Sequence, residues 1–254
     1  MRASFLIQSF GGRSVPAPEQ YDSRDPSVQN TVKVKPASII ALHQEVSQLT
    51  VALSGINFAI MCLVSMVLIR LAMPADPTEP GTWLADPGNR RSVYFALHLV
   101  PFMGLSFLWF MAVLRNRIGT DVGRIESTVF LGSGMLFVGT MFAAAAICRG
   151  LMDTVIADGF HASRDTYAIG RSVTYTIVNV FTIRMGAAFI FATSALARRA
   201  ELLPKWLTYL GYAIGNVLLF VIKEFAWIEL LFPAWVLLVS LHLLIADLRQ
   251  RRLQ

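Results

Sequence analysis

Residues 178–192 read "VNVFTIRMGAAFIFA", an apolar run that a single charged residue, Arg184, interrupts. The run belongs to a longer apolar segment, and the chain holds other segments of the same kind. Roughly 20 apolar residues, each rising about 1.5 Å along an α-helix, cover the hydrocarbon core of a bilayer. We therefore predict six membrane-spanning helices, at residues 50–72, 93–114, 128–148, 173–197, 206–222 and 225–246.

The composition supports this prediction. Of the 254 residues, 55% are hydrophobic and only 15% are charged, whereas about a quarter of an ordinary soluble domain is charged. The fold class that this composition indicates is an all-α, integral membrane six-helix bundle at residues 49–247. A cytoplasmic arm, residues 1–48, is expected to be partly disordered because it is rich in proline, amides and charge. Residues 248–254 form a basic cytoplasmic tail.

Basic residues predict the direction of threading. With the amino terminus in the cytoplasm, fourteen of the 22 Lys and Arg residues fall on the cytoplasmic side and six on the opposite side. The remaining two, Arg70 and Arg184, lie inside predicted helices. This excess follows the positive-inside rule, so both termini are expected to be cytoplasmic. Membrane topology also accounts for the basic pI, so no nucleic-acid partner is expected.

Arg184 is the main candidate for function. It lies eleven residues into segment 173–197, which places it roughly 16 Å deep, close to the bilayer midplane. An arginine at that depth needs acceptors, and Glu229 and Asn216 lie at depths from which they could reach it. One hypothesis is a site for an anion, a carboxylate or a lipid headgroup, because a guanidinium presents several donors in one plane. The alternative is a structural ion pair that fixes the order of the helices.

Histidine adds one more candidate ligand-binding residue, His98, near the outer leaflet. His242 is expected near the opposite leaflet, so the two cannot bracket one haem. No nucleophile with a base at motif spacing, no phosphate-binding loop and no zinc-protease pattern occurs in the sequence. We therefore expect no cofactor, no metal and no catalytic residues.

A small-residue pattern indicates close helix packing. Gly211 and Gly215 stand four residues apart in "GYAIG", and such spacing lets two helix backbones approach closely. In a chain with several membrane helices the contact is usually internal, but it can also form a dimer face.

Four stretches carry a resemblance to known sequences. These are "GLSFLWFMAVLRNRIG" (104–119), "STVFLGSGMLFVG" (127–139), "LPKWLTYLGYAIG" (203–215) and "LFPAWVLLVSLHLL" (231–244). They resemble a group of uncharacterised multi-pass membrane proteins of actinobacteria. The resemblance implies a bacterial plasma-membrane location and no assigned activity.

The sequence leaves two main hypotheses for function. The first is a non-enzymatic component of the lipid bilayer that associates with itself or with a larger membrane complex. The second is a carrier or binder of a small anionic or lipidic compound, which uses a site around Arg184. A membrane enzyme ranks third, because the sequence shows no recognisable acid, base or nucleophile constellation.

Overall fold

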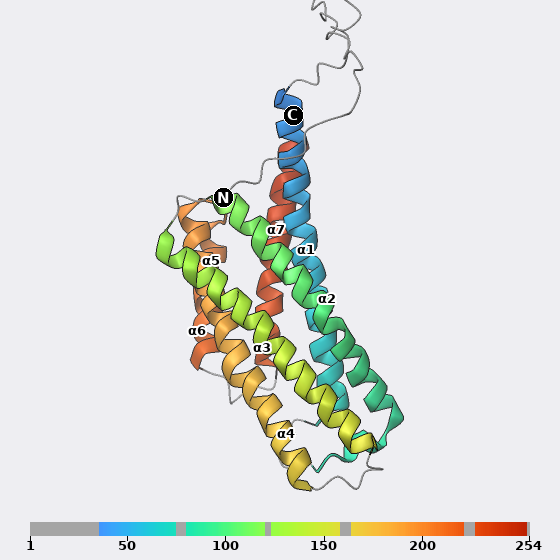
Figure 1. Cartoon of the computed structure of the whole chain (residues 1–254). Helices are drawn as coiled ribbons and strands as arrows, with labels where there is room; N and C mark the ends of the chain where they lie inside the picture. The colour runs from blue at the N-terminus through green and yellow to red at the C-terminus, as the bar shows by residue number, and fades with distance from the viewer. Residues whose placement is uncertain (1–35, 75–79, 120–122, 158–163, 221–226, 253–254) are drawn as a thin grey trace, which may run out of the picture. The chain divides into compact units, whose positions relative to one another are not determined.

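The computed structural model describes residues 36–74, 80–119, 123–157, 164–220 and 227–252. These residues are helical, with no strand among them. The chain divides into two units, Met1–Ala41 and Leu42–Gln254, and the helix bundle belongs to the second unit (Figure 1). Most of the predicted cytoplasmic arm lies outside the described residues.

Four of the predicted segments, 50–72, 93–114, 128–148 and 173–197, lie within longer helices, because polar residues continue those helices at their ends. Three short elements lie among them: the 3₁₀ turns η1 and η3, and the π-helical segment η2. The elements in chain order are α1 (Pro36–Ala72), η1 (Thr82–Ala85), α2 (Pro87–Ile118), α3 (Arg124–Ala157), α4 (Arg164–Thr176), η2 (Ile177–Thr182), α5 (Ile183–Arg199), α6 (Lys205–Phe220), η3 (Ile228–Leu230) and α7 (Leu231–Arg252).

Five helices of the described residues are long and apolar enough to cross a membrane. They are Ala52–Ala72, Pro87–Ile118, Arg124–Ala157, Asp165–Arg199 and Ile228–Arg249. The prediction of an all-α, membrane-type fold is thus confirmed, and five of the six predicted spans have such a helix. The predicted span at 206–222 is represented by α6, a helix of 16 residues, and residues 221 and 222 lie outside the described part.

Local sequence sets the ends of α2. The side chain of Asp86 accepts a hydrogen bond from the backbone N–H of Gly88 at 2.8 Å, and Pro87 occupies the first turn. An aspartate cap followed by proline is a strong start signal, since proline lacks an N–H that would need a partner there. The helix ends before Gly119, whose φ of +85° is a left-handed conformation that glycine adopts without strain.

A cluster of phenylalanine rings holds the helices together. Phe58 of α1, Phe107 of α2, Phe137 of α3, Phe189 of α5 and Phe232 of α7 lie with neighbouring ring centroids 4.5–6.3 Å apart. All five side chains are at least 96% buried. Aromatic rings tilted against one another at such separations add to the stabilisation that burial of their area provides.

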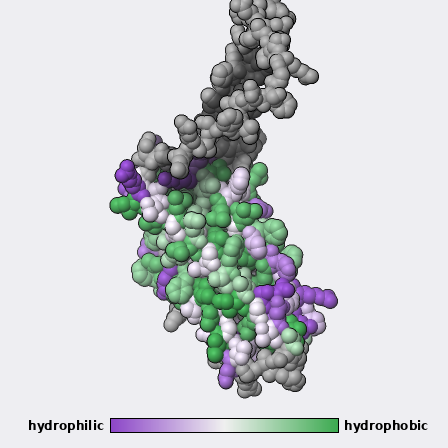
Figure 2. All heavy atoms as spheres, viewed as in Figure 1, coloured by the Kyte–Doolittle hydropathy of each residue, from purple (hydrophilic) through white to green (hydrophobic). Residues whose placement is uncertain are grey.

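The outer surface of the bundle is apolar, as a bilayer requires. Figure 2 shows mostly hydrophobic residues on the face that it presents, with hydrophilic residues towards the edges. Large side chains such as Leu105, Trp109 and Met135 are each more than half exposed. On a water-soluble protein so much exposed apolar surface would be a liability, whereas lipid accepts it at no cost.

The helices pack mainly on their neighbours in the chain. Figure 1 shows α3 running alongside α4 and α5, and α5 also packs on α6. The helix Asp165–Arg199, which contains α4, η2 and α5, is the most deeply buried of the five candidate spans. One side of this helix, together with α1, α2 and α3, borders a partly open cavity.

Candidate functional site

A cavity of about 180 Å³ lies among α1, α2, α3 and α4. Its walls are mostly apolar, and they include Ile69 of α1, Leu97 and Val100 of α2, and Ala144 and Ala145 of α3. The two 3₁₀ turns and the π-helical segment also contribute side chains to it. A largely apolar cavity with a few polar groups is the usual form of a small-molecule site.

An ion pair between Arg70 and Glu229 forms one polar edge of the cavity. Arg70 comes from the last turn of α1, and Glu229 belongs to η3, immediately before α7. The two side chains are only 19% and 10% exposed. Two opposite charges so far from water stabilise each other, and together they tie the end of α1 to the start of α7.

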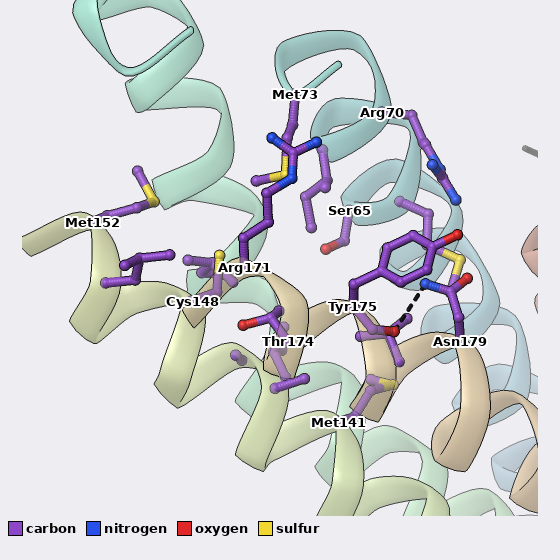
Figure 3. A pocket seen from close by; sticks show the side chains of 18 of the residues that line it. Ser65, Arg70, Met73, Met141, Cys148, Met152, Arg171, Thr174, Tyr175 and Asn179 are labelled. Carbon is purple, nitrogen blue, oxygen red and sulfur yellow. Dashed lines mark hydrogen bonds between the residues drawn. The ribbon is translucent and has the colours of Figure 1, made fainter. Parts of the chain in front are cut away.

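Asn179 reaches the cavity from the π-helical segment. Its side-chain nitrogen donates to the carbonyl of Tyr175 at 3.0 Å, one turn earlier in the chain. Figure 3 shows this bond beside Arg70, with Tyr175 and Asn179 on the same side of the cavity. Only the amide nitrogen of Asn179 is used in this bond, so its carbonyl oxygen is an acceptor suited to a ligand's hydroxyl or N–H.

The π-helical geometry explains why Asn179 has this position. A π segment inserts one extra residue into a helix and shifts the side chains around it, often at functional sites. The N–H of Ile183 bonds the carbonyl of Val178, five residues back. Thr182 adds two bonds, donating to the Ile177 carbonyl at 3.0 Å and lying 2.9 Å from the Thr140 hydroxyl of α3.

A second set of hydrogen-bonded side chains lies where η1 approaches α4. The indole N–H of Trp83 donates to the Tyr167 hydroxyl at 2.8 Å. Arg171 donates to the same hydroxyl at 3.0 Å and to the Pro74 carbonyl at 2.7 Å. Gly81, with φ of +95°, lets the chain pass close to the Tyr167 ring. These bonds fix the turn after α1 against α4 and place the aromatic side chains of Trp83 and Tyr167 in the wall of the cavity.

The predicted site residues are not brought together. Of the four, only Glu229 lines the cavity, and its partner is Arg70, not Arg184. Arg184 is partly buried and donates to the Val180 carbonyl of its own helix at 3.1 Å. His98 lies 2.6 Å from the Tyr94 carbonyl, and Asn216 donates to the Tyr212 carbonyl at 2.9 Å. Each of these bonds spans four residues of one helix.

The packing glycines contact other parts of the same chain. A side chain at Gly211 would meet the Ser194 hydroxyl of α5, and would lie 3.0 Å from the indole nitrogen of Trp235 in α7. At Gly215 a Cβ atom would lie 3.0 Å from the Phe191 ring of α5. Both glycines therefore allow α6 to approach α5 closely, which is the internal use of the small-residue pattern.

The sequence did not reveal Arg70 as the partner of Glu229. The sequence held one signal for this pair, because Arg70 and Glu229 are both predicted near the outer ends of their helices. No group of three or more His, Cys, Asp or Glu side chains suited to a metal ion occurs among the described residues.

Comparison of the chain with protein-family models, with curated proteins and with solved structures finds no match. A functional proposal for this chain therefore rests on the geometry and chemistry of the cavity.

Proposed function

We propose that this protein is a multi-pass membrane protein that binds a small, mostly apolar compound carrying one polar group, in the cavity among α1, α2, α3 and α4. The observation that supports the proposal is the combination in one cavity of apolar walls with a polar edge made by Arg70, Glu229 and Asn179. The apolar walls accept the body of the ligand, and the polar edge orients it.

The size of the cavity supports a small ligand. An apolar protein cavity of about 150 Å³ accommodates benzene, and the cavity here measures about 180 Å³. A compound with one or two rings, or a short acyl chain, fits this volume. A whole membrane lipid is larger than this volume, so the part of a lipidic ligand that lies inside the cavity is limited to a group of that size.

Self-association is the weaker of the two hypotheses. One of the features that supports it is the pair of glycines in α6, and these contact α5 and α7 of the same chain. Arg184 does not line the cavity. The polar residues that we propose for ligand binding are therefore Arg70 and Asn179 in place of Arg184.

For the topology we propose six crossings with both termini in the cytoplasm of a bacterial cell, on the strength of the distribution of basic residues. The cavity then lies in the outer half of the membrane. Single cysteines at Pro80 and Ile125, in a chain whose own cysteines are changed to alanine, test this. An impermeant maleimide should label the first and not the second in intact cells; the reverse pattern contradicts the topology.

Two alanines on α3 provide a matched test of binding. Ala145 lines the cavity, whereas Ala146, its neighbour in the chain, is exposed on the outer surface. We expect the wild-type protein in detergent to bind benzyl alcohol, measured by titration calorimetry. The variant Ala145→Phe should abolish binding because the ring fills the cavity, and Ala146→Phe should leave it unchanged. Equal binding by all three proteins contradicts the proposal.

A further inference from the structure

The cavity has an unusual concentration of sulfur. The chain contains ten methionines, and five of them line this one cavity: Met66, Met73, Met103, Met141 and Met152. Both cysteines, Cys62 and Cys148, line it as well, and both are free thiols.

The thioethers lie on several walls of the cavity. Met66 belongs to α1, Met103 to α2, and Met141 and Met152 to α3. Figure 3 shows Met73, Met141 and Met152 around the cavity, with their sulfur atoms in yellow. Met103, Met141 and Met152 are at least 92% buried, so these side chains are part of the protein interior and not of the lipid-facing surface.

Sulfur atoms in an apolar wall change which apolar groups bind to it most favourably. Leucine and valine attract saturated and aromatic groups alike, in proportion to the area that they bury. A thioether is more polarisable, and it makes an additional favourable contact with aromatic rings, commonly at the ring edge. Methionine is also unbranched and flexible, so its sulfur can adjust to the outline of a ring.

We propose that the ligand of this cavity is aromatic, and that Met66, Met103 and Met141 make the cavity prefer an aromatic ring to a saturated ring of the same size. The inference rests on the proposed function, because it names the class of compound that the same cavity binds. The polar group of the ligand then lies towards Arg70 and Asn179, and its ring lies between α1, α2 and α3.

Two alcohols separate this preference from simple hydrophobicity. Benzyl alcohol and cyclohexylmethanol carry the same polar group and similar ring sizes, but the saturated compound is the more hydrophobic. A cavity that recognises only apolar area should bind cyclohexylmethanol more tightly. A cavity that recognises the ring through sulfur should bind benzyl alcohol more tightly, by about two- to tenfold for each thioether contact.

The experiment measures both dissociation constants by titration calorimetry, in wild type and in the variants Met66→Leu, Met103→Leu and Met141→Leu, singly and combined. Leucine keeps the volume and the apolar character of methionine. Met135→Leu is the matched control, because Met135 is 64% exposed on the outside of α3. We expect the cavity variants to weaken benzyl alcohol binding while cyclohexylmethanol binding stays constant, and the control to change neither.

Two outcomes overturn the inference in different ways. If wild type binds cyclohexylmethanol at least as tightly as benzyl alcohol, and the leucine variants change neither constant, the aromatic preference is wrong and the proposed function stands. If wild type binds neither alcohol, both proposals fail. Should the combined variant not fold, the wild-type preference and the single variants still decide between these outcomes.

Discussion

The ion pair between Arg70 and Glu229 should contribute strongly to the stability of the bundle. The change Glu229→Gln keeps the size of the side chain and removes its charge. Arg70 is then left with a positive charge at a position where only 19% of its side chain is exposed. Removing one partner of a fully buried pair costs about 3–5 kcal/mol, and partial contact with solvent lowers that figure. We therefore expect a loss of about 2–3 kcal/mol in the free energy of unfolding.

The assay is equilibrium unfolding in mixed detergent micelles, followed by helical circular dichroism. Glu126→Gln serves as the control, because Glu126 pairs with Arg199, whose side chain is 55% exposed. An exposed pair of this kind contributes less than about 1 kcal/mol. The control should therefore lose much less stability than the buried pair.

A double-mutant cycle isolates the interaction itself. Arg70→Met removes the charge on the other side, and the double variant with Glu229→Gln removes both charges. Because no uncompensated charge then remains, the double variant should recover about 2 kcal/mol relative to the sum of the single losses. Strictly additive losses, or a loss in Glu229→Gln no larger than in Glu126→Gln, would refute the assignment of this pair.

Further predictions concern packing and the turn after α1. Gly55→Ala should cost about 1–3 kcal/mol in unfolding free energy, because the new Cβ would meet the Ser240 hydroxyl and lie 2.7 Å from the Phe110 ring. Ser240→Ala alone should be neutral or slightly stabilising, because this buried hydroxyl makes no hydrogen bond among the described residues. Combined with Gly55→Ala, the same change should restore part of the lost unfolding free energy. A double variant no more stable than Gly55→Ala contradicts the contact. Trp83→Phe should cost about 1 kcal/mol by removing the bond to Tyr167, and an unchanged unfolding midpoint would count against that bond.

The sequence predicts the fold class well because its signal is physical and local. A run of apolar residues such as 178–192 is stable as a membrane helix whatever its neighbours are. The exact bounds are harder to predict. Polar residues such as Arg164 and Arg249 continue a helix beyond its apolar part, and only the capping of the folded chain decides where it ends.

The candidate site was less predictable, because it depends on how the helices pack. Depth along a helix can be counted from the sequence, and this depth suggested Arg184 as the partner of Glu229. The partner in the structure is Arg70, in the last turn of α1. The rotation of each helix about its own axis, which decides which side chains face one another, cannot be read from the sequence in this way. The π-helical segment adds a further shift at Asn179, and nothing in the surrounding residues predicts that one extra residue is accommodated there.

The methionines illustrate the same limit. Met66, Met103 and Met141 are scattered over three predicted helices, and in a membrane segment a methionine is an ordinary apolar residue. Only the packing of α1, α2 and α3 brings them to one cavity. The sequence supplies the residues of the site, and the tertiary structure makes them a site.

Photolabelling in membranes tests most directly whether the cavity binds a small, mostly apolar compound. A benzyl alcohol analogue carrying a diazirine is activated by light, and the labelled residues are identified by mass spectrometry. We predict labels on cavity residues such as Met103 and Met141, reduced by excess benzyl alcohol and absent in Ala145→Phe. Labels confined to lipid-facing residues such as Phe102 and Trp109, and insensitive to competition, would contradict the claim.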